Sequence, residues 1–596
     1  MIFSYIKMYY HFIGFRVVFL ILFGILASIL ESLGIVLFIP LLDGMMSNYT
    51  AQSPGISEAE NSIIIEKIFI NFLPQDLLND PKIILFFILI FFCIKGIFVF
   101  SMLAYSSILR GELLRTISTT LVSKIVSANY QYISSKKPGY FVNIVNEQCL
   151  RSLDAFRSLV VFFSQFINAF ILISLTFLAS WTFALTALAM MLILSPMFIT
   201  LNKRIKIISR EVVGEKNELN NTVMQTIHSY KYLKATARTE YMYSIINVIN
   251  NNLASLYKHA GILASFTQSI KEPVAVLIIL LIFALEISFF QSKLSNIIVS
   301  ILLLYRGTNA MIAMQSSMQS CLENIASIEV ITEEIKILEA EKESMGRKSL
   351  LLNNSGIVLE KIKYSPPNSD TFVLGPISMK FPPNQVTAII GKSGSGKSTI
   401  ADLVSLNIQA NSGKLFIGDQ DSRDVDLTSW RKSISYITPE MVIIAGTIID
   451  NILFGKITKT PNDEVLKVLR SANLDLFADE IKNNTHREIY MGGTNLSSGE
   501  KQRLLFAREI IRNSKILILD EATSALDSKS EKIINETIIK LKKQCSILII
   551  THKLNILKDA DYIYIIENGQ IVEEGKFDKL YNNKNSELNK FTNNRK

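Results

Sequence analysis

Two long apolar runs near the start of the chain constrain its fold more than any other feature. They read RVVFLILFGILASILESLGIVLFIPLL from Arg16 and PKIILFFILIFFCIKGIFVFSMLAY from Pro81. Each run exceeds the roughly 20 residues that a helix needs to cross a bilayer. The first run is too long for the core of a signal peptide and is not followed by a small-residue cleavage site, so we expect a retained membrane span. Buried helices of a large soluble core are the alternative.

The distribution of apolar residues predicts a membrane half and a soluble half. The long runs lie before residue 320, and later residues alternate between short strands and helices. The pattern predicts spans at about 16–42, 82–107, 156–179, 182–201, 270–290 and 294–315. Residues 202–269 also have helical spacing with few breakers, so we expect the neighbouring spans to continue as helices beyond the membrane.

The charge distribution indicates which side of the membrane each segment faces. Lys and Arg gather in LNKRIKIISR and YQYISSKKPG, whereas residues 43–80 carry six acidic residues against one lysine. Under the positive-inside rule the basic segments are cytoplasmic and the acidic one external. An even number of spans then places the N-terminus and all residues after 320 in the cytoplasm. We attribute the net charge of +9 to topology and to contact with anionic lipid, and we predict no nucleic-acid partner.

The segment GKSGSGKST carries the clearest chemical signal in the soluble half. It follows the apolar strand QVTAII, precedes the helix TIADLVSL and fits G-x-x-x-x-G-K-[ST]. Its glycines let backbone N–H groups converge on phosphates, and the helix N-terminus favours negative charge. Lys397 should reach the β- and γ-phosphates, and Ser398 should bind Mg²⁺. The candidate ATP-binding residues of this loop are Gly391, Lys392, Ser393, Gly394, Ser395, Gly396, Lys397, Ser398 and Thr399.

A second apolar strand, in KILILDEATSALD, ends in two acidic residues. Asp520 is placed to bind Mg²⁺, and Glu521 is the candidate base that polarises the attacking water. Solvation of a strand end is the alternative role for both acids. Together with the glycine-rich loop, the pair predicts hydrolysis of a nucleotide, a reaction that proteins of many families carry out.

The order of the motifs indicates one family. The phosphate-binding loop is followed by NLSSGEKQR at Asn495–Arg503, then by Asp520 and Glu521, then by SALD, and finally by His552 after the strand CSILIITH. This order resembles the ATP-binding cassette of ABC transporters. The membrane half resembles that of ABC exporters in the number and order of its spans.

The resemblance implies a multi-domain fold, in which an α-helical six-span transmembrane domain with long cytoplasmic helix extensions precedes an α/β P-loop cassette. The expected domains are a transmembrane domain at 1–320, a linker helix at 321–350, the cassette at 351–585 and a polar tail at 586–596. The resemblance also implies ATP hydrolysis coupled to transport, with ATP and Mg²⁺ as cofactors. Because such cassettes hold ATP between two subunits, the chain should form a homodimer or a heterodimer with a similar chain.

Further site residues are implied by the resemblance alone. The signature residues that would contact ATP across the dimer interface are Ser497, Ser498, Gly499 and Glu500. Asp527 would communicate between the two ATP sites. His552 would contact the γ-phosphate beside Glu521, and these two residues form the expected catalytic pair.

The cassette departs from the family pattern at several positions. Ser498 and Glu500 stand where a glycine and a glutamine are expected. Glu440 replaces the usual glutamine that helps to ligate Mg²⁺, which a carboxylate can also do. Pro366 aligns with the usual adenine-stacking tyrosine, and Tyr364 lies two residues earlier. Whether Tyr364 stacks on adenine therefore stays open.

Ionisable residues within the apolar spans are candidates for the substrate path. Such groups are costly in a bilayer and usually face a partner or a cavity. As a hypothesis, Glu31 and Lys95 pair within the bundle, and Arg306 faces the translocation path. Glu286 lies in a similar position. Structural ion pairs, or positions near span ends, are the alternative.

The membrane half also gives an indication of the cargo. The stretches ESLGIVLFIPLL, SIIIEKIFINFL and LLLYRG are similar to those of bacterial lipid-linked oligosaccharide flippases in the ABC superfamily. In those proteins a short external helix assists handling of the lipid, and Ile63 to Leu73 could do likewise. The resemblance implies transport of a lipid-linked oligosaccharide or similar amphiphile across a bacterial cytoplasmic membrane. Export of peptides, drugs or other lipids, and an ATP-gated protein that transports nothing, remain alternatives.

Overall fold

The chain consists of two units that differ in the kind of structure they contain. The computed structural model describes residues 2–42, 80–179, 181–289, 294–343, 346, 348, 350, 356–366, 373–455, 462–483, 487–583 and 585–593. Its contacts divide the chain into a first unit, Met1–Ala128 with Tyr132–Lys342, and a second unit, Asn129–Gln131 with Glu343–Lys596.

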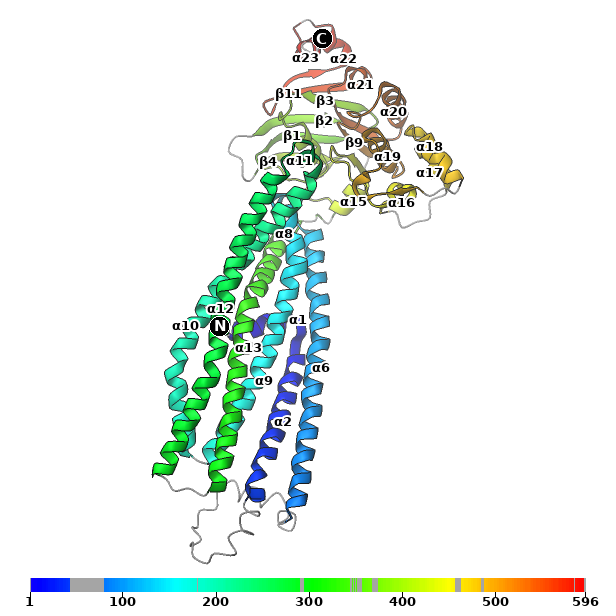
Figure 1. Ribbon diagram of the computed structural model, residues 1–596. Coiled ribbons are helices and arrows are strands. Elements are labelled where there is room, and N and C mark those ends of the chain that lie inside the picture. Colours follow the sequence, from blue (N-terminus) through cyan, green and yellow to red (C-terminus); the bar gives the residue numbers. More distant parts are fainter. Residues whose placement is uncertain are drawn as a thin grey trace, which may run out of the picture. The chain divides into compact units, whose positions relative to one another are not determined.

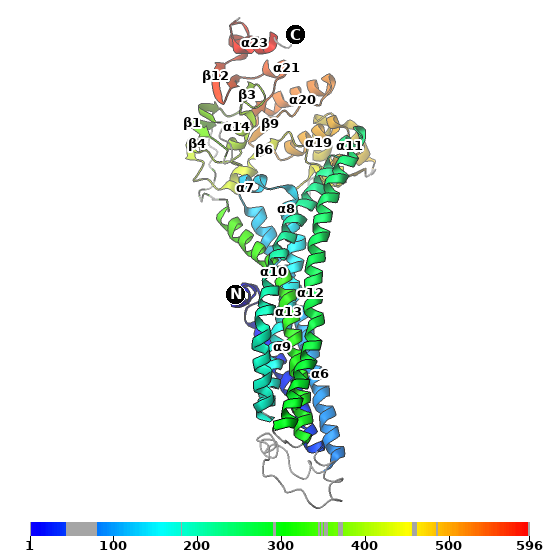
Figure 2. The ribbon, with the colours of Figure 1, turned by 60° about the vertical axis from the view of Figure 1, so that its left-hand side comes forward.

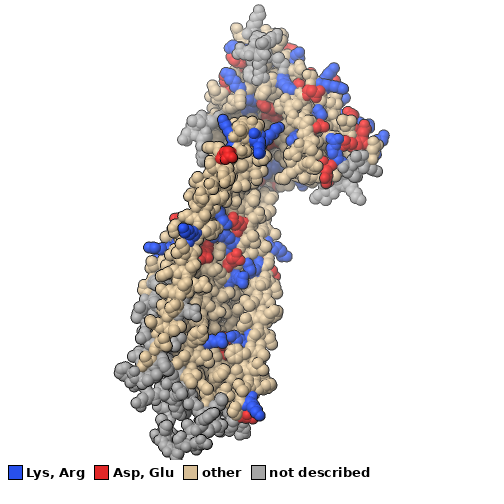
Figure 3. Space-filling model, in the orientation of Figure 1, with Lys and Arg blue, Asp and Glu red and all other residues tan. Residues whose placement is uncertain are grey.

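The first unit is built from long helices that lie side by side (Figure 1, Figure 2). The described α-helices before residue 343 are α1 Ile2–Ile13, α2 Val17–Val36, α6 Pro81–Ser127, α7 Tyr130–Ser135, α8 Pro138–Asn143, α9 Cys149–Ala179, α10 Trp181–His228, α11 Tyr230–Ala235, α12 Thr239–Phe289 and α13 Leu294–Ala340, with a 3-10 helix at Gly14–Arg16 and a π-helix at Ile144–Gln148. Figure 3 shows that uncharged residues cover most of the visible surface of these helices, as expected for a lipid-facing bundle.

Local sequence explains where α6 begins. The side chain of Asp80 accepts a hydrogen bond from the backbone N–H of Lys82 at 2.9 Å, and Pro81 occupies the first turn. Aspartate at the cap satisfies an unpaired N–H, and proline at the first helical position has the helical φ already fixed. The second predicted span therefore starts at a well-defined point.

Several helices are long and apolar enough to cross a membrane. Among the described residues, these segments are Met8–Leu42, Pro81–Ser127, Gly139–Leu178 and Ile298–Ala340. The first two segments contain the predicted spans at 16–42 and 82–107, and the other two overlap most of those at 156–179 and 294–315. The predicted spans at 182–201 and 270–290 fall in α10 and α12. The predicted external helix at 63–73 and the side chain of Glu286 lie outside the described part of the chain.

The last predicted span and the predicted linker helix are one element. Helix α13 runs without interruption from Leu294 to Ala340. Its residues after Gly307 include neither glycine nor proline, so nothing in the sequence breaks the helix where the linker was expected to begin. The helical part of the expected 321–350 linker thus ends at Ala340, and the division between the two units falls between Lys342 and Glu343.

The second unit combines sheets with helices. Its strands are β1 Ile357–Tyr364, β2 Leu374–Phe381, β3 Val386–Gly391, β4 Ser412–Ile417, β5 Gln420–Asp421, β6 Ile434–Ile437, β7 Gly446–Thr447, β8 Glu488–Ile489, β9 Ile516–Asp520, β10 Ser546–Ile550, β11 Tyr562–Glu567 and β12 Gln570–Gly575. Its helices are α14 Lys397–Val404, α15 Leu427–Lys432, α16 Ile448–Ile452, α17 Asn462–Ser471, α18 Asp475–Lys482, α19 Ser498–Ile510, α20 Ser528–Leu541, α21 Leu554–Leu557, α22 Phe577–Tyr581 and α23 Glu587–Asn593, with a short turn at Met491–Gly493.

A six-stranded sheet in the order β12-β11-β3-β10-β9-β6 forms the centre of this unit. Strands β11, β3, β10, β9 and β6 are parallel. Alternate side chains enter two different cores: Leu517 of β9 and Ile547 of β10 join one, whereas Ile518 and Leu548 join the other. A parallel sheet covered on both faces requires such continuous apolar strands, which is why VTAII and ILILD contain almost no polar residues.

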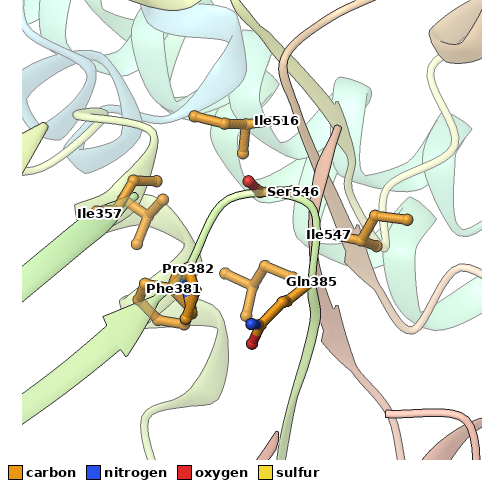
Figure 4. A pocket seen from close by; sticks show the side chains of 9 residues that line it. Ile357, Phe381, Pro382, Gln385, Ile516, Ser546 and Ile547 are labelled. Atoms are coloured by element: carbon orange, nitrogen blue, oxygen red, sulfur yellow. The ribbon is translucent and has the colours of Figure 1, made fainter. Parts of the chain in front are cut away.

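A second sheet, in the order β2-β1-β4-β5, contributes residues to the core that contains Ile518 and Leu548. Between the sheets, Ile357, Phe381 and Ile516 line a cavity of about 10 Å³ (Figure 4). A space of this size holds at most one water molecule. It is a packing defect of the core and no ligand site.

The C-terminal segment is more ordered than the expected polar tail. Helix α23 spans Glu587–Asn593, and Leu588 is fully buried within a core of the second unit. The carboxylate of Glu573 accepts hydrogen bonds from the Ser586 hydroxyl and the Glu587 N–H, each at 2.7 Å. The burial of Leu588 and these hydrogen bonds attach the helix to the rest of the second unit.

Candidate functional site

The glycine-rich loop joins the end of β3 to the start of α14. Gly394 and Gly396 have φ values of 79° and 102°, which glycine adopts without strain. A Cβ on Gly391 would lie 2.2 Å from the carbonyl oxygen of Ile566 in the neighbouring strand β11. These positions therefore require glycine, and their backbone N–H groups precede the N-terminus of a helix.

Lys397 is the first residue of α14 and is only 6% exposed. Its Nζ atom donates to the carbonyl oxygens of Gly391 at 3.0 Å and Lys392 at 2.8 Å. Burial lowers the pKa of Lys397, although the charges of Glu521 and Asp520 act in the opposite direction. The amine is thus held inside the curve of the loop, where it can meet a phosphate.

Asp520 ends β9 and is 1% exposed. Burial raises the pKa of Asp520 to about 6, against the opposing effect of a hydrogen bond from Ser398. Its Oδ2 atom has no hydrogen-bond partner among the described residues. A buried carboxylate oxygen with an unused lone pair beside a serine hydroxyl is a suitable pair of ligands for Mg²⁺. Asp520 and Ser398 would hold the ion, which would offset negative charge on the phosphates.

Glu521 and His552 lie at the same edge of the sheet, because they follow the adjacent parallel strands β9 and β10. The Nε2 atom of His552 is 2.8 Å from Oε1 of Glu521. Glu521 has a φ of 51°, a left-handed conformation that costs free energy in a residue with a side chain. Its N–H donates to the carbonyl oxygen of Ile550 at 3.0 Å, which fixes this turn. The carboxylate is held where it could polarise water beside the loop.

The signature stretch begins helix α19. Ser497 is the N-cap residue, and its hydroxyl accepts a hydrogen bond from the Glu500 N–H at 3.2 Å. The Glu500 carboxylate in turn accepts from the N–H of Ser497 at 2.8 Å. This is a capping box, in which the first and fourth residues satisfy each other's backbone donors. A Cβ on Gly499 would make only ordinary contacts, the nearest at 3.5 Å.

Two further residues of α19 connect it to the segment that contains Asp527. Gln502 donates to the Ser524 hydroxyl and accepts from the Ala525 N–H, both at 3.0 Å. Arg503 lies 3.8 Å from the Asp527 carboxylate, which itself caps α20. The sequence motifs gave no indication of roles for Gln502 and Arg503. Their spacing from Ser498 and Gly499, four residues in each case, would have placed them on the same face of the helix.

The positions that depart from the family pattern have different surroundings. Tyr364 ends β1 and is 7% exposed within an apolar core, which leaves little of its surface accessible to a nucleotide. Its stacking on adenine stays a prediction. Glu440 is exposed. Burial raises the pKa of Asp402 in α14, and the charge of Glu440 raises it further. The region around Ser398 therefore holds more acidic groups than the motifs alone indicated.

The first unit contains a second site, centred on Glu31 in α2. Lys95 of α6 lies 2.8 Å from Oε2 of Glu31, so the predicted pair is present. Arg306 of α13 lies 3.3 Å from Oε1 of the same carboxylate. Asn168 of α9, which the sequence did not suggest, donates to Glu31 at 3.3 Å. Four helices therefore meet at one buried carboxylate, whose side chain is 6% exposed.

These residues line a cavity of about 760 Å³. Its lining combines polar and apolar side chains: Ala27, Ser28, Glu31, Lys95, Val99, Met102, Leu103, Val161, Ser164, Gln165, Asn168, Leu302, Tyr305, Arg306, Asn309 and Ala310. Small-molecule sites in proteins typically measure about 300–1,000 Å³. The cavity is therefore large enough for an amphiphilic ligand or for part of a larger one.

Two family descriptions match the chain. The ABC transporter transmembrane region matches residues 17–312, and the ABC transporter domain that binds ATP matches residues 374–524. The first match covers most of the helical unit, and the second runs from β2 through the glycine-rich loop, the signature and the acidic strand end.

Curated relatives are similar over both halves. The chain is 27% identical over 420 residues to an ATP-dependent lipid A-core flippase of Francisella novicida, which covers 69% of this chain and 70% of that protein. It is 28% identical over 415 residues to the flippase of the same name from Photorhabdus laumondii, covering 67% and 69%. It is 24% identical over 466 residues to the heterocyst differentiation ATP-binding protein HepA of a Nostoc species, covering 77% and 76%.

A solved structure shares the whole fold. The chain superimposes on a bacterial Atm1-family ABC exporter with ATP bound, with a TM-score of 0.76 over 96% of this chain and 97% of that one. Sequence identity in this comparison is 16%, so the likeness concerns the fold alone. The expected fold class, a helical transmembrane domain followed by an α/β cassette, is confirmed.

Proposed function

Because the chain belongs to the ABC transporter family and hydrolyses ATP to drive transport, we propose that it flips a lipid-linked oligosaccharide or a similar amphiphile across a bacterial cytoplasmic membrane. The observation that carries this proposal is the intramembrane cavity around Glu31, which is lined by both polar and apolar side chains. An amphiphile presents the same two kinds of surface. The relatives named lipid A-core flippases support a lipid cargo.

The cassette supplies the chemistry. The loop N–H groups and Lys397 bind the β- and γ-phosphates, and Ser398, Asp520 and Glu440 are the proposed ligands of Mg²⁺. Glu521 orients and polarises the attacking water. His552, whose Nε2 lies 2.8 Å from Oε1 of Glu521, positions that carboxylate relative to the γ-phosphate. Most of the rate enhancement in such a site comes from positioning and from stabilisation of charge.

The chain works as a dimer in this proposal. It carries one glycine-rich loop and one signature, so a complete ATP site of the ABC type needs a second cassette. Ser497 to Glu500 and Asp527 of one subunit then meet the phosphates held by the other. A homodimer is the simplest assembly, and a similar chain as partner is the alternative.

Orientation follows from the distribution of charge. The positive-inside rule assigns the basic segments between the predicted spans to the cytoplasm and the acidic segment at 43–80 to the outside. The N-terminus and the cassette are then cytoplasmic. ATP is then available to the cassette, and the cavity receives its ligand from the bilayer.

Transport in proteoliposomes tests the proposal. Purified chain is reconstituted with a fluorescent lipid-linked oligosaccharide, and an external quencher reports movement between leaflets. We expect movement that requires ATP and is abolished in Glu521→Gln. The exposed residue Glu574 gives a matched control, because Glu574→Gln makes the same chemical change away from the site.

The cargo is tested separately from the motor. Parallel assays use a lipid without saccharide, a hydrophobic peptide and a cationic dye. ATP-dependent movement of one of these, with the oligosaccharide lipid left in place, would replace the proposed cargo. ATP hydrolysis without movement of any probe would favour an ATP-gated protein.

A further inference from the structure

Lys553 joins the segment that follows β10 to the segment that follows β9. It comes directly after His552, and its Nζ atom donates to the carbonyl oxygen of Thr523 at 2.7 Å and to the carboxylate of Glu531 at 2.8 Å. Thr523 is 5% exposed and lies two residues after Glu521, and Glu531 lies in the first turn of α20. One ammonium group therefore connects the two segments that carry the expected catalytic pair.

The segment Glu521–Asp527 forms a turn whose conformation must be held by its surroundings. Glu521 is in the left-handed region, which costs free energy and persists only where neighbouring contacts enforce it. Within the turn, the Leu526 N–H donates to the carbonyl oxygen of Thr523 at 3.3 Å. Lys553 donates to the same oxygen over a shorter distance, and a hydrogen bond from a charged donor is stronger than one between neutral groups. Lys553 is therefore the stronger of these two contacts.

A further contact to the turn comes from α19. Gln502 donates to the Ser524 hydroxyl and accepts from the Ala525 N–H, both at 3.0 Å. These two residues follow Thr523 in the direction of Asp527. Removal of Lys553 would therefore leave the Asp527 end of the turn anchored to α19 and would loosen the end that carries Glu521.

The placement of His552 depends on the same lysine. The Nδ1 atom of His552 is buried and has no hydrogen-bond partner among the described residues, so no contact at this nitrogen orients the ring. The backbone N–H of Lys553 donates to the hydroxyl of Thr551 at 3.1 Å, which fixes the backbone on either side of His552. Because the ammonium group of the same residue binds the turn after Glu521, Lys553 helps to set the separation of His552 and Glu521.

We propose that Lys553 is a positioning residue for ATP hydrolysis, which holds the turn after Glu521 so that the Glu521 carboxylate stays directed at the attacking water. The inference rests on the proposed role of Glu521 as the group that polarises this water. Lys553 acts through Glu521. We assign it no contact with ATP, because its ammonium group is bound to two protein acceptors.

Glu531 keeps the ammonium group of Lys553 in place. The Glu531 side chain is 12% exposed, and its Oε1 atom has no hydrogen-bond partner among the described residues. An ion pair that serves only the stability of the fold is the alternative role for Lys553. Replacing a buried ion pair by apolar side chains is often neutral or stabilising, whereas removal of one partner is destabilising. A double replacement therefore separates the two roles.

The test measures steady-state ATP hydrolysis and the melting temperature of the full chain in nanodiscs. Lys553→Met removes both hydrogen bonds, so we expect kcat to fall by about 10- to 30-fold. The KM for ATP should stay within about twofold, because the glycine-rich loop is untouched. Lys553→Arg keeps donors for both acceptors and should retain kcat within about threefold. The double variant K553M/E531M should recover the melting temperature of the parent and keep the low kcat of Lys553→Met.

Lys542→Met is the matched control. Lys542 Nζ lies 2.5 Å from the Asp561 carboxylate, and the Lys542 side chain is 32% exposed, close to the 31% of Lys553. Asp561 also accepts from the Val386 N–H at the start of β3, whereas the glycine-rich loop follows the end of that strand. Lys542→Met should therefore leave both kcat and KM at the values of the parent.

A parent-like kcat in Lys553→Met overturns the inference, and so does a rise in KM that accounts for the loss of activity. Recovery of kcat in K553M/E531M would show that the lysine serves only to compensate the charge of Glu531. An equal loss of kcat in Lys542→Met or Lys553→Arg would show that the contact with Thr523 is not the cause. If Lys553→Met does not fold, the kcat of the double variant decides in the same way.

Glu521→Gln is assayed alongside, so that the two proposals fail separately. Parent-like hydrolysis in Glu521→Gln would overturn the proposed role of Glu521. Loss of hydrolysis in Glu521→Gln together with a parent-like kcat in Lys553→Met would overturn the role of Lys553 alone.

Discussion

Ser497 and Glu500 are hydrogen-bonded to each other at the start of α19. The Ser497 hydroxyl donates to the Glu500 carboxylate at 2.7 Å, and the Ser497 N–H donates to the same oxygen at 2.8 Å. The glutamate that departs from the family pattern therefore replaces the expected glutamine in a structural role. Glu500 also places a negative charge beside the hydroxyl of Ser497, a residue expected to contact ATP.

Substituting Glu500 should separate these two effects. Glu500→Gln keeps an oxygen that can accept the Ser497 N–H but removes the charge, so we expect the KM for ATP to fall by about two- to fivefold. Glu500→Ala should remove the cap and destabilise the chain by about 1 kcal/mol. Steady-state ATPase assays and thermal unfolding measure the two quantities. An unchanged KM in Glu500→Gln would mean that the charge does not act on the nucleotide.

The cap should also respond to acid. Burial acts to raise the pKa of Glu500, but the hydrogen bonds from Ser497 outweigh it and hold the pKa below its ordinary value. A carboxyl with a lowered pKa in the folded state contributes stability above its unfolded pKa and loses it as pH falls through the folded one. As pH falls through the folded-state pKa of Glu500, the free energy of unfolding of the parent should therefore decrease more than that of Glu500→Gln. Identical acid profiles would contradict the shift.

His552 should act through hydrolysis and leave ATP binding intact. His552→Ala removes the 2.8 Å contact with Glu521, so we expect the rate of ATP hydrolysis to fall by about 100-fold. ATP affinity, measured with a fluorescent analogue, should change by less than about twofold because Lys397 and the loop are untouched. His486→Ala is the matched control, since it replaces a histidine outside the expected motifs. Loss of affinity in His552→Ala would indicate a binding role.

Arg508 should stabilise the helical part of the cassette. Its guanidinium donates to the carbonyl oxygens of Asn451 and Val442, each at 2.7 Å, and to the Asn451 side chain at 2.8 Å. Lysine cannot reach all three buried acceptors, so we expect Arg508→Lys to destabilise the cassette by about 2–4 kcal/mol. Denaturant unfolding measures the loss. Arg470→Lys, on the exposed face of α17, should have no effect.

A tyrosine pair in the first unit provides another stability test. Glu334 is 2% exposed and accepts hydrogen bonds from the hydroxyls of Tyr132 at 2.7 Å and Tyr140 at 2.6 Å. Tyr140→Phe leaves a buried carboxylate oxygen with one partner fewer and should destabilise the unit by about 1–3 kcal/mol. Tyr243→Phe, at a residue that is 65% exposed, is the control. Equal melting temperatures for the two variants would show that water replaces the lost hydroxyl.

Arg306 should matter for transport more than for the motor. Arg306→Ala removes a cation from the membrane cavity and leaves the cassette unchanged, so transport should fall while basal ATP hydrolysis stays within about twofold. Proteoliposome transport and ATPase activity are measured on the same preparation. Unchanged transport would remove Arg306 from the substrate path.

The cassette could be predicted from the sequence because its motifs are local. Gly394 and Gly396 are required by their own positive φ values, and Asp520 and Glu521 follow directly from the end of an apolar strand. Because β9 and β10 are adjacent and parallel, the residues that follow their ends, Glu521 and His552, lie close together. Short-range constraints of this kind leave a pattern in a single sequence.

Contacts between distant residues left no such pattern. Asn168 reaches Glu31 across 137 positions, and Tyr140 reaches Glu334 across 194. Nothing in the local spacing of these residues distinguishes them from other polar residues on a helix. The docking of α23 was missed for the same reason, since the contacts that attach it include Leu588 and a carboxylate in β12.

The uninterrupted course of α13 has a mechanical consequence. From Arg306 to Ala340 the helix extends about 50 Å, at the usual rise of about 1.5 Å per residue. Gly307 is the last residue of this stretch at which the helix could bend easily. A tilt of about 5° there would sweep the far end through about 4 Å. A small tilt near the cation that α13 contributes to the cavity would thus become a larger displacement at the far end of the same helix.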